Sequence, residues 1–249
     1  MKIDVNVKSP ADAILKKLDS IAVLSDGDQA ALRALPLTVA EVSRDSDILA
    51  EGDRPQRSLI VLDGLVCRYR MLSDGGRQIT SFHPPGDMPD LQSLFLHRMD
   101  HSIAPLCASK IAFVEHRDLR QLIDNRPGLC ATLWRDTLID AAIYREWLVG
   151  LGRRRAHQRV AHLMCEMGSR LKAVGLFRNQ SFGLPLTQTE LADAAGLSPV
   201  HLNRVLRDLR SWNLVRFQDY VVSSPDWLAT KQLAGFDSAY LHQKPGRAI

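Results

Sequence analysis

The chain of 249 residues carries a formal net charge of +4, and 45% of its residues are hydrophobic, which is enough for two modest domains with a core in each. Its first residues contain no apolar signal core and no apolar run approaches membrane-spanning length, so these properties exclude a membrane protein and favour the cytoplasm. The cysteines form no CxxC pair and lack zinc-finger spacing, so we expect reduced thiols and no structural metal at Cys67, Cys107, Cys130 and Cys165.

The N-terminal half is predicted to begin with helices and to continue with short strands. Residues 10–36 have apolar residues at helical spacing, which predicts one or two short helices. From about Leu37 to Phe113, β segments alternate with glycine turns; Asp63-Gly64 predicts a hairpin, and residues 73–76 form a second turn. This pattern indicates an antiparallel sandwich or barrel, and no long helix interrupts it, which argues against a parallel α/β sheet.

A long helix is predicted to follow, starting at residues 125–128. Its apolar and small residues recur at nearly the 3.5-residue repeat of helices that pack on a partner helix, at Cys130, Trp134, Leu138, Ala141, Leu148 and Leu151. This stripe fits either a dimer interface or a core face. Gly150-Leu151-Gly152 is predicted to break the helix and to form a hinge.

The most informative stretch is residues 188–207, where two short helical patterns meet at Gly196. Thr187 and Glu190 have the spacing of a capping box, and Ser198 followed by proline is typical of a second helix start. Glycine at the junction tolerates the positive φ that a sharp turn needs. Two capped helices joined in this way predict a helix-turn-helix that enters the major groove of DNA; the alternative is an ordinary helical hairpin.

Charge is concentrated around this motif. Residues 150–217 hold eleven Lys and Arg residues against four acidic ones, whereas the rest of the chain is mildly acidic. Such an imbalance predicts a phosphate-binding surface joined to a domain with another task. Residues 212–223 are predicted to form a β wing with its turn near Gln218-Asp219, and the tail beyond about Lys231 is weakly patterned, with disorder expected for PGRAI at its end.

The order of these elements resembles that of the Crp/Fnr family of bacterial transcription regulators. The resemblance covers nearly the whole chain and is carried by ILAEGD (48–53), LIVLDGLVCRYR (59–70), DGGRQITSFHPPGD (74–87), AHQRVAHLMCEM (156–167) and LTQTELADAAGLSPVHLNRVLRDLRSWNLV (186–215).

The resemblance implies an α+β chain in four parts. These are an N-terminal cyclic-nucleotide-binding-like antiparallel β-roll (1–125), a long dimerisation helix and hinge (126–152), a C-terminal winged helix-turn-helix (153–230) and a tail (231–249). It also implies a cytoplasmic homodimer that regulates transcription by binding double-stranded DNA at a two-fold operator through the recognition helix, residues 198–209, and that contacts RNA polymerase.

Arg204 is expected to read DNA directly, because an arginine can donate two hydrogen bonds to guanine and because it matches the family's base-reading arginine. Val200 lies near the position of a family glutamate and cannot accept a hydrogen bond, so the half-site is expected to differ there. The other candidate residues on the second helix are Ser198, Pro199, His201, Asn203 and Arg207, while Thr187, Gln188 and the wing residue Arg216 are expected to contact the phosphate backbone.

The β-roll lacks the charge expected of a cyclic-nucleotide site. Family members that bind these nucleotides place a Gly-Glu turn and an Arg-Ser pair around the phosphate, and the matching residues here are Gly86-Asp87 and His101-Ser102. A neutral histidine offers fewer donors than arginine, and neighbouring aspartates repel phosphate. We therefore expect no response to cyclic AMP; an unknown small-molecule effector, thiol oxidation or control by abundance are the alternatives.

Enzyme signatures are missing. The sequence has no GxSxG, HExxH, P-loop or dinucleotide glycine fingerprint, no HxH pair and no N-terminal cysteine cluster, so it predicts no catalytic residue, metal or cofactor. The alternative function is a β-roll sensor of a small molecule or metal, or an enzyme, with no specific DNA role. A third alternative, an interaction module that does not bind DNA, leaves the basic segment and Arg204 unexplained.

Overall fold

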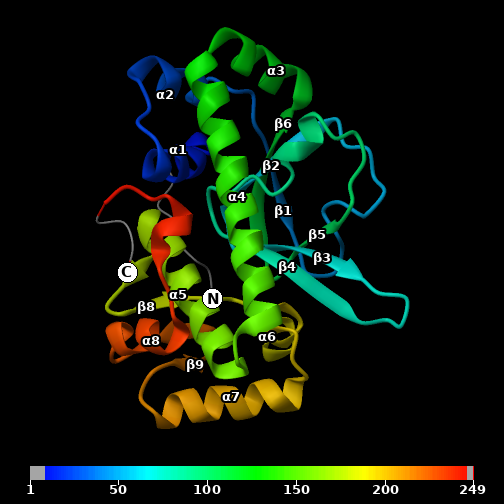
Figure 1. Cartoon of the computed structure of the whole chain (residues 1–249). Helices are drawn as coiled ribbons and strands as arrows, with labels where there is room; N and C mark the ends of the chain where they lie inside the picture. Colours follow the sequence, from blue (N-terminus) through cyan, green and yellow to red (C-terminus); the bar gives the residue numbers. More distant parts are fainter. Residues whose placement is uncertain (1–8, 246–248) are drawn as a thin grey trace.

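The computed structural model describes residues 9–245 and Ile249, and it places a β-roll beside one long helix, with a second sheet and its helices near the lower end of that helix (Figure 1). The predicted N-terminal helices are present. Elements up to the long helix are α1 (Ala11–Ile21), α2 (Asp26–Arg33), β1 (Thr38–Val42), β2 (Arg57–Asp63), β3 (Val66–Met71), β4 (Arg77–His83), η1 (Leu91–Leu94), β5 (Ser102–Pro105), β6 (Ser109–Glu115) and α3 (His116–Asn125).

The β-roll consists of two three-stranded antiparallel sheets, with strand orders β1-β6-β2 and β4-β3-β5. Their facing sides bury fully apolar residues such as Ile60, Ile79 and Phe82. Because an open antiparallel sheet is stable only when its apolar face is covered, the two sheets stabilise each other and α1 and α4 close the rest of the core.

The predicted hairpin at Asp63-Gly64 is wrong. β2 pairs with β6, whereas β3 pairs with β4 and β5, so the chain passes from one sheet to the other at this turn. Gly64 has a φ of +89°, and a Cβ there would lie 2.9 Å from the Cα of Ser109. The glycine is therefore required by a close approach of two backbone segments, not by a two-residue hairpin turn. The second predicted turn, at residues 73–76, does join the paired strands β3 and β4.

The long helix α4 (Pro127–Arg153) runs without interruption through the predicted hinge at residues 150–152, so that prediction is wrong. A glycine in a helix interior costs only about 1 kcal/mol, and here the helix end is well capped. Arg159 of α5 (Ala156–Ala173) donates hydrogen bonds to three carbonyl oxygens of that end, those of Gly150, Leu151 and Arg154, at 2.9, 3.2 and 3.1 Å. Helix α4 ends at Arg153, and α5 begins at Ala156.

The C-terminal part is a winged helix-turn-helix on a four-stranded sheet with the order β7-β8-β10-β9. The turns Asn179-Gln180 and Asp219-Tyr220 have positive φ at both residues, as in type I′ hairpins. The wing turn thus lies one residue later than predicted. The turn of the other hairpin, at Asn179-Gln180, contains no glycine that would have indicated it in the sequence. The elements are β7 (Phe177–Arg178), β8 (Ser181–Gly183), α6 (Gln188–Ala195), α7 (Pro199–Ser211), β9 (Arg216–Gln218), β10 (Val221–Ser223), α8 (Trp227–Ala234) and η2 (Ser238–Leu241).

The chain beyond Lys231 is structured where it is described, in contrast to its weak sequence pattern. It completes α8 and then forms η2, from which the Tyr240 hydroxyl donates a hydrogen bond to Glu166 of α5 at 2.9 Å. Lys244 forms an ion pair with Asp19 of α1 at 2.9 Å. Polar contacts therefore hold this segment in place. Most of PGRAI, residues 246–248, lies outside the described residues.

Within the part of the chain that the structure describes, no helix has both the length and the apolar composition needed to span a membrane.

Candidate DNA-binding surface and β-roll interior

The two helices of the helix-turn-helix begin and end as the sequence predicts. The Thr187 hydroxyl accepts from the backbone N–H of Glu190 at 3.2 Å, and the Glu190 carboxylate accepts from the backbone N–H of Thr187, which completes a capping box at α6. Gly196 has a φ of +60° and ends α6, and the Ser198 hydroxyl accepts from the N–H of His201 at 3.2 Å to begin α7. Local sequence alone therefore fixes the geometry of this motif.

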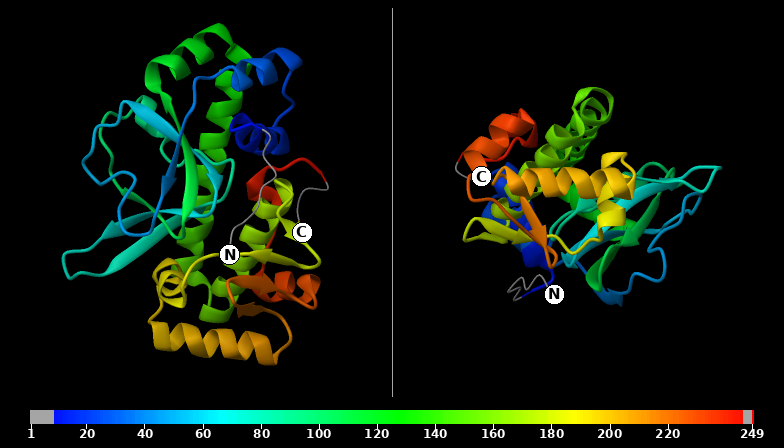
Figure 2. Two further views of the ribbon diagram at one scale, coloured as in Figure 1. Left: turned by 180° about the vertical axis from the view of Figure 1, so that it is seen from behind. Right: turned by 90° about the horizontal axis from the view of Figure 1, so that it is seen from below.

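Helix α7 presents one polar face to solvent. Leu202, Val205 and Leu209 are buried against α5 and α6, so the opposite face of the helix is free. The helix lies along the lower edge of the molecule (Figure 1), and it crosses the face seen from below (Figure 2, right). The exposed residues include every candidate DNA-binding residue predicted on this helix, namely Ser198, Pro199, Val200, His201, Asn203, Arg204 and Arg207.

The residues predicted to contact the DNA phosphate backbone differ in their exposure and in the hydrogen bonds that they already make. Gln188 and Arg216 are exposed, and Arg216 donates to Asn213 at 3.2 Å, an exposed hydrogen bond. The Thr187 hydroxyl is half-buried and donates to Glu190 at 2.9 Å while it accepts from the backbone. Its first role is therefore to cap α6, and any phosphate bond would compete with that cap.

Asp87, a predicted effector residue, is instead the centre of a buried ion-pair cluster. Its carboxylate lies 3.0 Å from Lys17 of α1 and 2.6 Å from Arg170 of α5. Burial alone raises the pKa of Asp87, but Lys17 and Arg170 outweigh burial and hold this pKa well below its ordinary value. Asp87 is therefore ionised, and its neighbours within the chain already neutralise it.

Gly86 is required by the close approach of helix α1. It has a φ of +98°, and a Cβ there would lie 2.7 Å from the carbonyl oxygen of Ala13 in α1. The turn that faces a nucleotide phosphate in the family is thus covered by the N-terminal helix in this chain.

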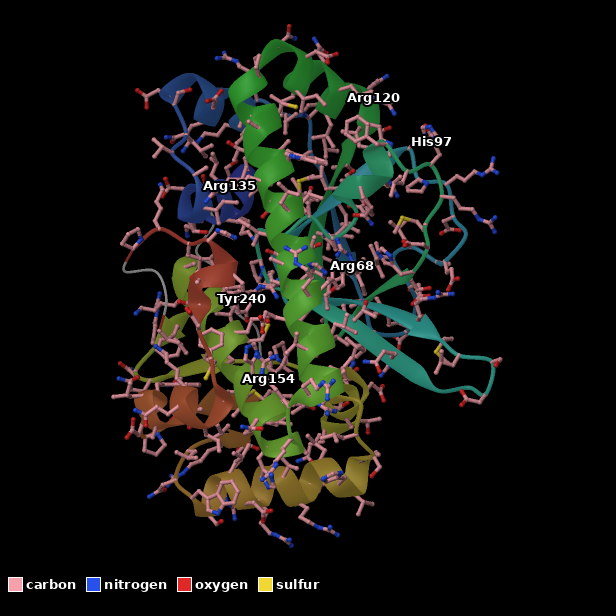
Figure 3. All side chains as sticks on the ribbon, in the orientation of Figure 1. Arg68, His97, Arg120, Arg135, Arg154 and Tyr240 are labelled. Atoms are coloured by element: carbon pink, nitrogen blue, oxygen red, sulfur yellow. The ribbon has the colours of Figure 1, made fainter. Side chains whose placement is uncertain are left out.

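Arg68 of β3 forms a second buried cluster. Its guanidinium donates hydrogen bonds to Asp140 and Tyr144 of α4 and to the carbonyl oxygen of Pro89. Figure 3 shows Arg68 on the β-roll side of α4. Burial and the positive charge of Arg68 lower the pKa of nearby His83 to about 4, so His83 is neutral near pH 7 and its 3.2 Å contact with Asp87 is a hydrogen bond, not an ion pair.

The space between the two clusters is small. A cavity of about 20 Å³ lies between the β-roll and α4, lined by residues that include Lys17, Arg68, Asp87, Asp136 and Asp140. Such a volume holds one or two water molecules, whereas small-molecule pockets measure about 300–1,000 Å³. Side chains of the chain itself therefore fill the interior that faces α4.

The predicted pair His101-Ser102 does not join Asp87 around this cavity. His101 contacts Asp100 at 2.7 Å, and burial together with Arg68 lowers its pKa, so it is neutral near pH 7. Ser102 is buried, and its hydroxyl accepts from the backbone N–H of Glu51 at 3.0 Å. No contact links His101 or Ser102 to Asp87 among the described residues.

The buried clusters around Asp87 and Arg68 were not predicted from the sequence. One signal was available: Asp136 and Asp140 stand four residues apart on α4, on the side of the helix away from the predicted apolar stripe. Carboxylates at that spacing face one direction and require cationic partners when they are buried, here Lys17 for Asp136 at 3.3 Å and Arg68 for Asp140.

Ion pairs also join the helix-turn-helix to the β-roll. Arg44 lies 2.6 Å from Glu190, and Arg77 of β4 lies 2.8 Å from Asp193, both acidic residues belonging to α6. Gln78 donates to the carbonyl oxygen of Asp193 at 2.8 Å. Helix α6 is therefore held between the β3–β4 hairpin and the recognition helix α7.

Together, these features define a class: a DNA-binding regulator that combines a cyclic-nucleotide-binding-type β-roll with a winged helix-turn-helix. Residues 39–126 match the cyclic nucleotide-binding domain, and residues 158–230 match the Crp-like helix-turn-helix domain. The chain belongs to the Crp/Fnr family and is a DNA-binding transcription regulator, as its sequence resemblance predicted.

Individual relatives have low sequence identity to this chain but match most of its length. The nitrogen fixation regulation protein FixK of Rhizobium meliloti (strain 1021) is 26% identical over 186 residues, covering 74% of this chain and 81% of the relative. The transcriptional activator protein anr of Pseudomonas aeruginosa is 22% identical over 226 residues, covering 91% and 88%. The solved structure of FixK2 from Bradyrhizobium japonicum shares the fold with a TM-score of 0.74 at 24% identity, over 82% of this chain and all of that one.

Proposed function

We propose that the protein regulates transcription as a homodimer whose two long helices α4 pack together. This proposal rests on a line of exposed large apolar side chains along α4: Trp134, Leu138 and Leu148 are 63%, 50% and 70% exposed. Such a line on a helix of a single subunit is an interaction surface, because isolated chains seldom leave contiguous apolar area in water. Its near-heptad spacing suits a parallel helix pair, and two-fold symmetry then presents two recognition helices to a two-fold operator.

Within each half-site, we assign direct base reading to Arg204 and neighbouring contacts to Ser198, Pro199, His201 and Asn203. The exposure of Arg204 in the middle of α7 supports this role. Val200 is 73% exposed and offers only apolar contact, which suits a thymine methyl group. Arg207, Thr187, Gln188 and Arg216 are assigned to the phosphate backbone, where they position the protein without reading sequence.

The β-roll is proposed to serve as a sensing or scaffolding domain (1–125) without cyclic AMP as its effector and without catalytic activity. The self-neutralised Asp87, the neutral His101 and the small cavity beside α4 support this assignment. Residues 126–152, predicted as the dimerisation helix and hinge, then serve as the dimerisation helix alone. Residues 153–230 form the DNA-binding domain, and the regulator contacts RNA polymerase.

The test combines oligomeric state with DNA binding. Sedimentation velocity of the native chain is expected to show a dimer at micromolar concentration, and Leu138→Asp is expected to give monomers and to lose binding to an operator selected from genomic fragments. Leu228→Asp is the matched control, because Leu228 is 68% exposed on α8, away from α4. A native monomer that binds DNA as a monomer would contradict the proposal.

A further inference from the structure

The face of α4 assigned to the dimer contains one charged residue. The alternating three- and four-residue spacing of a heptad runs through Ala131, Trp134, Leu138, Ala141, Arg145, Leu148 and Gly152, and each of these is exposed or half-exposed. We call this set the heptad face. Six of its members are apolar or small, and only Arg145, about two thirds of the way along α4, carries a charge.

Arg145 has no anionic partner among residues 9–245, which the structure describes. It makes no hydrogen bond or ion pair with any described residue. The three carboxylates of α4 are already engaged with other cations: Asp136 with Lys17, Asp140 with Arg68, and Glu146 with Arg154 at 2.7 Å. The heptad face therefore carries a positive charge that no carboxylate of the same helix neutralises.

Dimerisation would place two such charges together. In a parallel helix pair, a residue at the heptad position of Arg145 faces the same residue of the second copy and fits between the neighbours one turn away, here Ala141 and Leu148. Ala141 is small, so the layer has room beside the two guanidinium groups. Tyr144 borders it, with its hydroxyl already held by Arg68. Two arginines in one layer repel each other unless an anion lies between them.

We propose that Arg145 of two copies forms a binding site for one phosphate-like tetrahedral oxyanion on the two-fold axis. This inference rests on the proposed homodimer. The guanidinium is a planar fork of N–H donors that stays charged at all physiological pH values, and paired forks match the oxygens of a dianionic oxyanion. Packed helices lie about 8–10 Å apart, which leaves space for free phosphate but not for a bulky ester group. Oxyanion concentration would then set the fraction of dimer, and with it the occupancy of DNA.

The experiment measures the monomer–dimer dissociation constant of the full chain by sedimentation, in sodium chloride and in sodium phosphate of equal ionic strength. Phosphate is expected to lower the dissociation constant at least about threefold relative to chloride, and calorimetry is expected to give one phosphate per two chains. Arg145→Gln should still dimerise, and its monomer–dimer dissociation constant should be the same in phosphate as in chloride. Arg145→Lys keeps the charge but loses the fork, so most of the phosphate effect should disappear.

Arg135→Gln is the matched control. Arg135 is also exposed and lacks a partner among the described residues, but it lies ten residues from Arg145, about 15 Å along the helix. It should retain the full phosphate effect.

The outcomes separate the two proposals. A chain that stays monomeric in both salts would refute the homodimer and the site together. A dimer that ignores phosphate, or whose phosphate response survives Arg145→Gln, would refute the site alone. A response to phenyl phosphate as large as that to free phosphate would place the anion outside the helix pair and would also overturn the assignment.

Discussion

Replacing Asp90 by asparagine is expected to stabilise the protein against unfolding. The gain in unfolding free energy over the native chain should be larger at neutral pH than at acidic pH. Asp90 is 0% exposed at the start of η1. One carboxylate oxygen accepts from the backbone N–H of Leu59 at 2.8 Å, and the other has no hydrogen-bond partner among the described residues. Burial raises the pKa of Asp90 from 3.8 to about 7, because neither the Leu59 bond nor Arg68 offsets the loss of solvent.

The direction of the effect follows from proton uptake. Between about pH 4 and about pH 7 the folded chain keeps the Asp90 proton while the unfolded chain has lost it, so the unfolding free energy falls as pH rises through this window. At about 1.4 kcal/mol per pH unit, the difference between 3.8 and about 7 gives a ceiling of about 4 kcal/mol. Asparagine has the shape of the neutral acid and does not ionise, so Asp90→Asn removes this loss.

Urea unfolding at several values between about pH 4 and about pH 8 measures the effect as the difference between variant and native chain. His83 and His162 act in the opposite direction, because burial lowers their pKa values to about 4 and about 3, but they contribute equally to both proteins and cancel. Asp124→Asn, on an exposed residue of α3, is the control and should leave the pH dependence unchanged. Parallel curves for the native chain and Asp90→Asn would refute the reasoning.

Three further predictions concern binding and the α4–α5 junction. Arg204→Ala should cost about 1–3 kcal/mol per half-site and relax preference at one base pair, whereas Arg207→Ala should weaken all sequences alike; binding to operators with single base changes checks both, and unchanged discrimination in Arg204→Ala would exclude base reading. Calorimetry should show no micromolar binding of cyclic AMP, and binding that His101→Ala abolishes would restore a nucleotide sensor. Arg159→Ala removes hydrogen bonds to the end of α4 and should lower the unfolding free energy by about 2 kcal/mol and speed proteolysis near residues 154–155, while exposed Arg153→Ala should change neither.

Features set by local chemistry were predictable from the sequence. The capping box at Thr187, the turn at Gly196 and the start of α7 at Ser198 depend on neighbouring residues alone, and all three are confirmed. The exposed face of α7 followed from its apolar spacing. The family resemblance and the order of the β-roll, long helix and winged domain are confirmed for the same reason: they are carried by contiguous segments.

Features set by distant partners were not predictable in this way. Asp63-Gly64 has the composition of a hairpin turn, but the partner of β2 is β6, some fifty residues later in the chain. The glycines near the end of α4 suggested a hinge because nothing in the sequence shows that Arg159 caps that helix. Asp87 matched a family ligand position, yet its charge is used inside the chain by Lys17 and Arg170, which lie far from it in sequence.

The contacts of the C-terminal segment with α1 are the last to become available during synthesis. Lys244 pairs with Asp19 across 225 positions of sequence, and its backbone N–H bonds to the carbonyl oxygen of Ser20 at 2.8 Å. A ribosome makes α1 first and these partners last, and domains fold in the order of their synthesis. Helix α1 therefore packs on the nascent β-roll through its own apolar face. The DNA-binding half joins it earlier, through Arg170 of α5 and the ion pairs of α6, and residues 238–244 add the last contacts with α1.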